Sequence, residues 1–342
     1  MPIPKISLIS VGLIFVFSSC QKDEPLPSLP KQVMMAPGHF PSTVYNFGNF
    51  PPDEKKVAIG RRLFYDESLS LDSTISCASC HKQNAAFADE GRQVSTGVNG
   101  SPGFRNAPAL FNLAWKPLFM WDGGIVNLEL QPIAPITDAH EMSMSLSEVL
   151  IRLNSNENYK QLYKGAFGTE EINSQMLLVS FAQFLATMVS SQSAYDKFIL
   201  GDATSLNENQ VRGLNIFREN CSSCHTEPLL SDYSFRRNGL SITAQDSGRQ
   251  RITLDEDDRG RFMVPSVRNI SLSSPYMHDG RFQTLDEVID HYINPENTFQ
   301  IDESIGIGIP LNNEERGDLI EFLKSLDDPH FVNNPIFSDP VN

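Results

Sequence analysis

Two Cys-x-x-Cys-His pentapeptides contain four of the five cysteines in the chain. They read CASCH at 77–81 and CSSCH at 221–225, so their side chains are Cys77, Cys80, His81, Cys221, Cys224 and His225. In this arrangement two thiols add across the vinyl groups of a haem, and the imidazole of the next residue ligates the iron. The pattern therefore predicts two covalent c-type haems with His81 and His225 as proximal ligands.

Three alternatives account for the same spacing: a zinc knuckle, a thioredoxin-like redox pair, or coincidence. A zinc site would need its remaining ligands close by in a similar spacing. A redox pair would not require a histidine at the fifth position of both motifs. The haem interpretation is the one that explains all five residues of each pentapeptide.

Helical signals dominate the segments that must position these motifs. We expect helices to begin at Pro51, at Ser145 (a capping box with Glu148, running toward Lys164), at Ser174, at Thr284 (running through Tyr292) and at Asn313. Strand-like alternation is scarce. The sequence thus predicts a mainly α fold, with two cytochrome c-like domains that each carry one covalent haem, long connecting loops and little β structure.

The surroundings of the two motifs are alike. Residues 60–64 and 213–217 are Gly-initiated, Phe-terminated segments that precede the first and the second motif. Downstream, Arg-Asn is followed by Trp-Asp-Gly within 105–123, and by His-Asp-Gly within 268–280. This parallel indicates an internal duplication.

The N-terminal residues predict export. Residues 1–20 contain a lysine, an apolar run and then Ser-Ser-Cys, a layout typical of a secretory signal. Cys20 resembles the lipidated cysteine of a bacterial lipoprotein, although an ordinary signal peptide with an incidental cysteine is the alternative. We expect a periplasmic or outer-membrane lipoprotein anchored through Cys20, with residues 21–44 as a solvated tether. An oxidising compartment suits covalent haem attachment.

The rest of the chain suits two domains, which we place at 45–170 and 171–342. No other segment is long and apolar enough to cross a membrane. The formal net charge of −15 disfavours a nucleic-acid partner and would attract a basic protein, although an acidic surface also serves solubility alone. The oligomeric state is open, with a homodimer among the options.

Five further segments support a family assignment. They are RNAPALFN at 105–112, WDG at 121–123, EM at 141–142, VPSVRN at 264–269 and PYMHDG at 275–280. In order and spacing they resemble the bacterial di-haem cytochrome c peroxidases and their relative MauG. The resemblance covers about residues 45–330.

The resemblance implies a division of labour between the two haems. The N-terminal haem would be the peroxidatic centre, where hydrogen peroxide is reduced to water. The C-terminal haem would accept electrons from a small cytochrome or copper protein and pass them across the domain interface. Trp121 lies where the family places a tryptophan between the haems, which makes it a candidate relay; by residue type alone it would be a packing residue.

Peroxide cleavage needs a proton-handling group above the iron, because the outer oxygen leaves readily only when it is protonated. The resemblance places Glu141 at the family's acid position and Gln131 at that of a second distal side chain. By residue type alone, Glu141 would be a solvated acid and Gln131 a polar helix residue.

Members of the family that need reductive activation carry a distal histidine in the loop after the first motif. The corresponding segment 94–104 contains no histidine. We therefore expect a five-coordinate or water-bound ferric iron at rest. His39, His140 and His330 are the substitutes to consider, and His140, beside Glu141, is expected to point away from the iron.

The C-terminal haem needs a sixth ligand if it is to transfer electrons without reacting with peroxide. Where related peroxidases with high-potential haems carry a methionine, this chain has Tyr292, as MauG does. A phenolate favours oxidised iron, whereas a thioether favours ferrous iron. The alternative is that Met277 coordinates the iron and Tyr292 packs on the haem; His278 and His291 are expected to be structural.

The family also implies a calcium ion between the domains, for which the matching groups are Asn106 and the carbonyls of Ser273 and Pro275. Three functions follow from the residues and the resemblance. The first is hydrogen peroxide reduction with an external donor. The second is MauG-like oxidation of a protein or small molecule through a two-haem high-valent state. The third, against which Glu141 and Gln131 argue, is a plain electron-transfer cytochrome.

Overall fold

The computed structural model describes residues 36–49, 51–241, 245–297 and 301–340. Helices predominate, and the one sheet found in these ranges is a two-stranded antiparallel ribbon of β1 (Phe235–Arg236) and β2 (Phe262–Met263). The mainly α prediction is confirmed. The predicted signal at 1–20, with Cys20, lies outside the described residues, and within them no helix is both long and apolar enough to span a bilayer.

The helices fall into two groups along the chain. The first group is α1 (Glu54–Tyr65), α2 (Cys77–Cys80), α3 (Ile133–Thr137), α4 (Leu146–Asn154), α5 (Glu157–Phe167) and α6 (Ser174–Thr187). The second group is α7 (Ala194–Ile199), α8 (Glu208–Asn220), α9 (Gln250–Thr253), α10 (Leu285–Ile293), α11 (Asn313–Lys324) and α12 (Pro329–Val332). Short 3₁₀ turns join them: η2 (Glu67–Leu69), η3 (Gln83–Ala85), η4 (Val98–Gly100), η5 (Leu113–Trp115), η6 (Leu128–Leu130), η7 (Glu256–Asp258) and η8 (Ile270–Leu272).

Side-chain caps start these helices where the sequence predicts. The Asp53 carboxylate accepts the backbone N–H groups of the first turn of α1, and Thr284 forms a capping box with Glu287 at α10. The helix expected from Ser145 toward Lys164 is instead two helices, α4 and α5. They separate because the Asn156 side chain accepts the N–H groups of Asn158 and Tyr159 and so caps a new helix.

Each half is built on a pair of crossed helices. α1 packs on α6, and α8 packs on α11. Both crossings depend on a glycine: a Cβ on Gly60 would lie 2.0 Å from the Ser180 carbonyl oxygen, and one on Gly213 would lie 2.0 Å from that of Asp318. Two backbones can approach this closely only where a side chain is missing. The shared device supports the duplication inferred from the sequence.

Two segments that follow residue 170 pack in the first half of the structure. The domain boundary expected at residue 170 separates α6 from α1, whereas these helices pack together. The end of the chain also returns to the first half, where Phe331 and Phe337 are buried with Phe87 in an aromatic core. Of the expected tether 21–44, the structure describes only 36–44, and there Phe40 is buried against Trp115.

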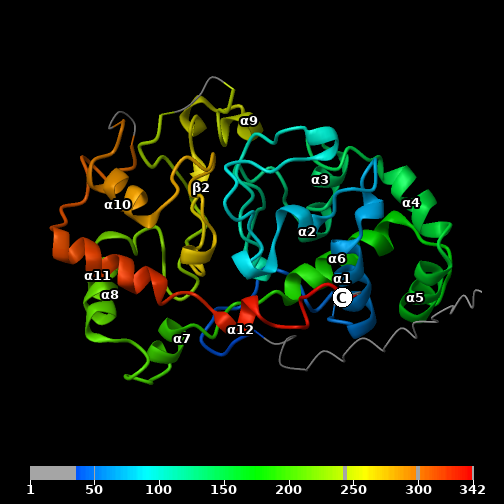
Figure 1. Cartoon of the computed structure of the whole chain (residues 1–342), viewed down its shortest axis with the longest axis horizontal. Coiled ribbons are helices and arrows are strands. Elements are labelled where there is room, and N and C mark those ends of the chain that lie inside the picture. Colours follow the sequence, from blue (N-terminus) through cyan, green and yellow to red (C-terminus); the bar gives the residue numbers. More distant parts are fainter. Residues whose placement is uncertain (1–35, 50, 242–244, 298–300, 341–342) are drawn as a thin grey trace, which may run out of the picture.

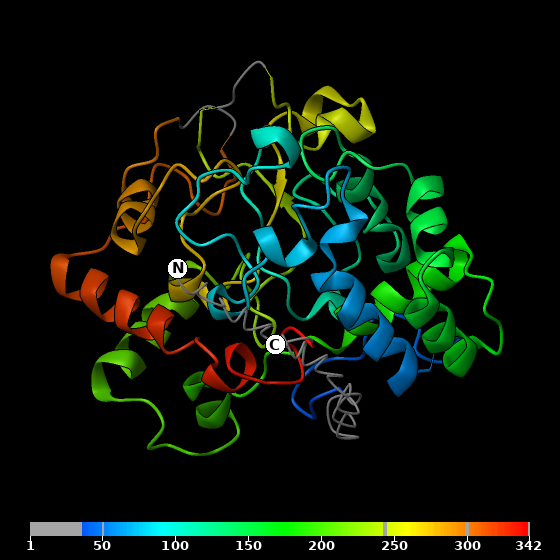
Figure 2. The same cartoon turned by 45° about the vertical axis from the view of Figure 1, so that its right-hand side comes forward.

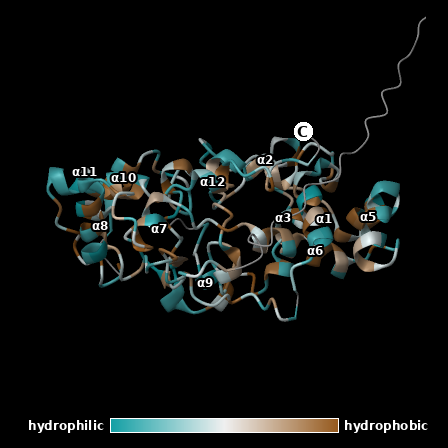
Figure 3. Cartoon of the chain, turned by 90° about the horizontal axis from the view of Figure 1, so that it is seen from below, coloured by the Kyte–Doolittle hydropathy of each residue, from teal (hydrophilic) through white to brown (hydrophobic). Residues whose placement is uncertain are grey.

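Figure 1 shows the resulting arrangement, with α1 and α4 to α6 at one end, α8, α10 and α11 at the other, and long loops with β2 between them. The last described residues lie against α1, where the Arg61 side chain donates to the Ser338 carbonyl and the Tyr65 hydroxyl donates to the Phe337 carbonyl. Figure 2 shows the same grouping after a 45° turn. Seen from below, hydrophilic and hydrophobic residues share the helices at both ends (Figure 3), as expected for helices with one face on a core.

Candidate haem sites

The first motif forms a single helical turn, α2. The Ser76 N–H donates to Ser79 Oγ at 3.0 Å, and the His81 N–H donates to the Cys77 carbonyl at 2.9 Å. Because the turn ends at His81, both thiols and the imidazole belong to one compact unit. Cys77, Cys80 and His81 line the same pocket.

The His81 ring is fixed by a backbone carbonyl. Its Nδ1 lies 2.7 Å from the oxygen of Phe87. A carbonyl can only accept, so Nδ1 carries the proton and Nε2 keeps a free lone pair for a metal. Phe87 adopts a left-handed φ of 62°, a costly conformation for a bulky residue, and it is held there in the aromatic core. Burial lowers the pKa of His81, which favours the neutral ligand form.

The second motif repeats this device. His225 Nδ1 lies 3.2 Å from the carbonyl oxygen of Leu230, which also has a left-handed φ, of 56°. Burial lowers the pKa of His225 too. Both halves therefore use a strained turn a few residues beyond the histidine to orient the ring. Sequence reasoning missed both acceptors, because nothing in a Phe or a Leu signals a positive φ.

The four thiols fit covalent haem attachment. All are free, and burial raises the pKa of Cys77 and of Cys221 to about 12. Cys77 and Cys221 are therefore neutral thiols near pH 7, unlike the activated thiolates of redox pairs. In the part of the chain that the structure describes, no group of three or more His, Cys, Asp or Glu side chains gathers as a metal site, so the zinc alternative has no ligand set there.

The structure brings Glu141 and Gln131 together at the first motif. Both line the pocket that contains Cys77, Cys80 and His81. Burial, followed by the charge of Asp138, raises the pKa of Glu141 to about 7. An acid with that pKa is half protonated near neutral pH and can give up a proton there.

Gly97 sets the position of the Glu141 backbone. A Cβ at this residue would lie 2.1 Å from the His140 carbonyl oxygen and 2.6 Å from that of Glu141. The next residue, Val98, donates its N–H to the Glu141 oxygen at 2.8 Å. In the sequence this loop stands out for its lack of histidine, and its Ser-x-Gly pattern is the signal that could have revealed the close approach.

Of the three substitute histidines, only His140 borders this pocket. Its Nδ1 lies 2.9 Å from Ser101 Oγ, and its ring packs edge-on against Phe104. His39 instead contacts Asp196 at 3.1 Å, and His330 is exposed on α12.

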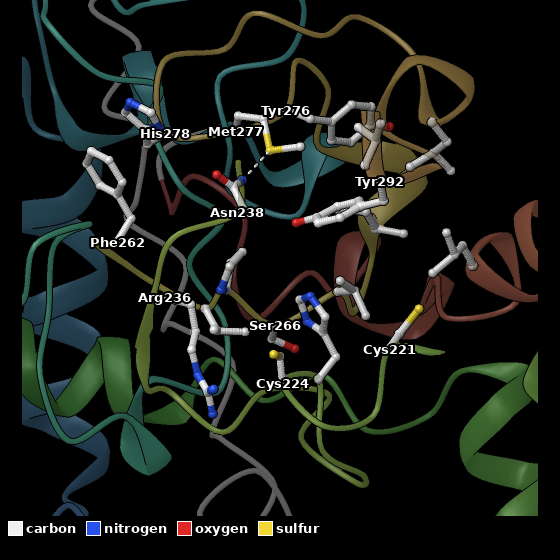
Figure 4. A pocket seen from close by; sticks show the side chains of 18 of the residues that line it. Cys221, Cys224, Arg236, Asn238, Phe262, Ser266, Tyr276, Met277, His278 and Tyr292 are labelled. Carbon is white, nitrogen blue, oxygen red and sulfur yellow. Dashed lines mark hydrogen bonds between the residues drawn. The ribbon is translucent and has the colours of Figure 1, made fainter. Parts of the chain in front are cut away.

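The pocket at the second motif has a different wall. Tyr292 and Met277 both line it, opposite Cys221 and Cys224 (Figure 4). Asn238 lies between them, with Nδ2 3.4 Å from Met277 Sδ, and the Tyr292 hydroxyl points toward it. Burial raises the pKa of Tyr292 to about 12, with the Asn238 hydrogen bond acting in the opposite direction. Asn238, one asparagine in a loop, gave no signal in the sequence.

The two expected structural histidines lie near this wall. His278 stacks on Phe262 with ring centroids 3.7 Å apart and also lines the pocket. His291 is buried, and its Nε2 lies 2.8 Å from the Asn238 carbonyl oxygen. A ring nitrogen facing a carbonyl must be the protonated one, so this nitrogen of His291 is engaged as a donor.

Trp121 lines the second pocket, and its neighbour in the chain reaches a residue of the first. Its indole N–H donates to the Asn106 carbonyl at 2.8 Å. The preceding residue, Met120, has its Sδ 4.0 Å from the Gln131 amide nitrogen in the first pocket. A buried carboxylate, Asp122, follows Trp121 and accepts hydrogen bonds from Arg105 and from Arg251. The bond from Arg251 ties this segment to the C-terminal half.

The three residues expected to bind calcium belong to the lining of one pocket. Asn106, Ser273 and Pro275 all line the second pocket. The Asn106 amide nitrogen donates to the carbonyls of Arg92 and Gln93, both at 3.3 Å. These two hydrogen bonds orient the amide, so that its oxygen is turned away from the two carbonyls. Oxygen donors of this kind suit a hydrated Ca²⁺.

Comparisons with known proteins agree with this geometry. The family model described as di-haem cytochrome c peroxidase matches residues 54–204. The methylamine utilization protein MauG of Methylophilus methylotrophus is 33% identical over 307 residues, which cover 87% of this chain and 89% of that protein. The cytochrome c peroxidase Ccp of Escherichia coli (strain K12) is 35% identical over 289 residues, which cover 81% of this chain but 59% of that protein.

A solved structure matches as well. The crystal structure of a MauG-like protein associated with microbial copper homeostasis has a TM-score of 0.83 and 33% sequence identity, over 90% of this chain and 99% of that one. Agreement over nearly the whole length shows that both halves, and not only the segment matched by the family model, share the arrangement.

Proposed function

Because this chain belongs to the family of the di-haem cytochrome c peroxidases and MauG, we propose that it reduces hydrogen peroxide to water with electrons from a small external redox protein. The family implies two c-type haems, which 77–81 and 221–225 would hold. The observation that carries the proposal is the half-buried Glu141 carboxyl, with a pKa raised to about 7, in the pocket of His81.

At the first site the haem would supply an iron that binds peroxide and delivers two electrons to it. The chain's own groups manage the protons. The Glu141 carboxyl donates a proton to the oxygen that leaves as water, and the Gln131 amide hydrogen-bonds the bound peroxide. Overall, one peroxide, two electrons and two protons give two waters. His81, whose Nδ1–H is held by the Phe87 carbonyl, would use its Nε2 lone pair to hold the iron.

At the second site the chain would hold the haem in a saturated state that passes electrons on. Tyr292 is the proposed sixth ligand, with Met277 as the alternative, because both line the pocket opposite the motif. Trp121 is the proposed relay toward the first site, since it adjoins Met120, which approaches Gln131. Asn106 with the carbonyls of Ser273 and Pro275 would hold Ca²⁺ near this path.

A MauG-like oxidation of a protein or small molecule is the second candidate. The observation that favours it is Tyr292, because a phenolate ligand stabilises oxidised iron and so the storage of oxidising equivalents. Relatives named MauG match over most of the chain. For location we propose a periplasmic or outer-membrane lipoprotein anchored through Cys20, on the strength of the signal-like residues 1–20.

The test is a peroxide titration of the purified ferric holoprotein, followed by optical and EPR spectroscopy, with and without a reduced small cytochrome or copper protein. The peroxidase proposal expects rapid turnover with such a donor. A long-lived oxidised species that does not react with the donors would favour the MauG-like function. If neither haem centre binds cyanide or reacts with peroxide, both candidate functions are refuted.

A further inference from the structure

A cleft in the N-terminal half lies apart from both haem sites. Its volume is about 570 Å³, which is within the usual range of small-molecule sites. Its walls are residues 44–46, η5 with the residues that follow it, η6, and the first turns of α6. None of the described residues that line it also lines the pocket of either Cys-x-x-Cys-His motif. It is therefore a separate cavity.

The mouth of the cleft is apolar. Val44, Val126 and Leu130 line it and are 58%, 61% and 39% exposed. They are three of the ten large hydrophobic side chains that are exposed in the part of the chain that the structure describes. Deeper in, the lining includes the buried side chains of Phe119 and Leu128. Exposed apolar residues that gather at a concave site are typical of a ligand-binding surface.

One cation lines this apolar cleft. Lys116 is the only Lys, Arg or His among the described residues of its lining. Burial alone lowers the pKa of Lys116 to about 8, with no neighbouring acid acting on it. No carboxylate of the described residues comes within ion-pair distance of its Nζ, in a chain that carries a formal charge of −15.

The one acid that lines the cleft acts on Tyr45 and not on Lys116. Glu129 lines the same cavity, where burial and the Glu129 charge together raise the pKa of the Tyr45 phenol, whereas burial alone shifts the pKa of Lys116. Lys116 is thus a half-buried ammonium to which no carboxylate of the described residues supplies a counter-charge. A partly buried, unpaired charge costs free energy, which is recovered if a bound anion supplies the missing partner.

We propose that this cleft binds a small amphiphilic carboxylate whose acid group pairs with Lys116 and whose hydrocarbon part covers the apolar mouth. A single ammonium matches a single carboxylate, whereas a dianionic phosphate would need further cationic donors that the described lining does not contain. The hydrocarbon part would bury the exposed valines and leucine, which removes apolar surface from water. The proposal is independent of the peroxidase function.

The experiment measures octanoate binding to the holoprotein by calorimetry, with 1-octanol as a probe of similar shape and no charge. Lys116→Met removes the ammonium and keeps an apolar side chain. Lys56→Met is the matched control, because Lys56 is also half-buried and packs on an aromatic ring, that of Phe167, outside the cleft.

We expect octanoate to bind the unmodified protein and the Lys56 variant, and to bind the Lys116 variant about tenfold more weakly. Octanol should bind more weakly than octanoate and show no difference between the unmodified protein and Lys116→Met. Octanoate affinity that survives Lys116→Met, or no saturable octanoate binding to the unmodified protein, would overturn the proposal.

A second measurement needs no variant. Lysines labelled by reductive ¹³C-methylation report their own titration by NMR, and Lys116 should give the signal that titrates at the lowest pH. A bound carboxylate stabilises the charged amine, so octanoate should raise the midpoint of that signal, and octanol should not. An unchanged midpoint at saturating octanoate would reject the ion pair with Lys116.

Discussion

The two Cys-x-x-Cys-His sites are alike on the side of the histidine and differ on the opposite wall. In both, Nδ1 of the histidine meets a carbonyl of a residue with left-handed φ, Phe87 or Leu230. Opposite, the first pocket presents Glu141, whereas no Asp or Glu of the described chain lines the second, which presents Tyr292. The repeated backbone device thus orients the histidine in both sites, whereas only the first pocket has a carboxyl group in its lining.

The largest effect should come from removing one haem at a time. With Cys77→Ala and Cys80→Ala, covalent haem measured as the pyridine haemochrome should fall by half, and peroxide reduction should be lost completely, because the proton-handling wall has no iron. With Cys221→Ala and Cys224→Ala, haem content should fall equally, but the remaining centre should still bind cyanide. If peroxide reactivity instead followed the second pair, the assignment of the two sites would be reversed.

The next largest effect should come from replacing Glu141, the acid that distinguishes the first pocket from the second. Glu141→Gln should slow peroxide cleavage by about 10² to 10⁴-fold, measured by stopped-flow, since the amide cannot give up a proton. Glu157→Gln on the exposed face of α5 is the matched control and should leave the rate unchanged.

The same carboxyl predicts a pH dependence. Its pKa is raised to about 7, so the protonated donor is present below pH 7 and is lost above it. The rate of peroxide cleavage should therefore be highest in acid and fall about tenfold per pH unit above 7. The Glu141→Gln protein should show no such fall. A profile that is identical in both proteins would remove Glu141 from proton transfer.

A smaller effect should follow from disturbing the backbone of residues 140–141 in the first pocket. Gly97→Ala would place a methyl group 2.1 Å from the His140 carbonyl oxygen, which can be relieved only by moving the 140–141 backbone. We expect a loss of about 1–3 kcal/mol in the free energy of unfolding, and about a tenfold slower peroxide reaction. Gly165→Ala is the control, because nothing lies within 4 Å of a Cβ there. Full activity of the Gly97→Ala protein would show that Glu141 tolerates displacement.

Some features of these sites could be predicted from the sequence and others could not. The difference lies in whether a feature depends on residue type and spacing or on the folded backbone. The motifs, Glu141, Gln131, Tyr292 and Met277 could be found from residue type and family spacing, and the structure places them in two pockets. Phe87, Leu230 and Asn238 could not, because each acts through backbone conformation or through partners distant in the chain. For the close contact of Gly97, the one signal in the sequence is its Ser-x-Gly pattern. The return of Phe331 and Phe337 to the first core is hidden for the same reason.

The helix starts show the same distinction on a local scale. A cap such as Asp53 or Thr284 is determined within four residues, so its sequence signal suffices. The break between α4 and α5 was missed, although the Asn156 cap that produces it is equally local. Helical periodicity across both segments concealed the interruption.

The smallest effect on turnover should come from replacing the candidate sixth ligands, Tyr292 and Met277, in the pocket of the second motif. These replacements are also the sharpest test of that pocket. Tyr292→Met should raise the reduction potential of one haem, on the order of 100 mV, because a thioether favours ferrous iron over a phenolate. Met277→Leu keeps the bulk and should leave both potentials near their original values if Tyr292 is the ligand. The opposite outcome, a shift with Met277→Leu alone, would transfer the ligand role to Met277.

Since Asn238 contacts both side chains, the same amide would orient either ligand. The reduction potentials of the variants, and not the fold, therefore discriminate between Tyr292 and Met277.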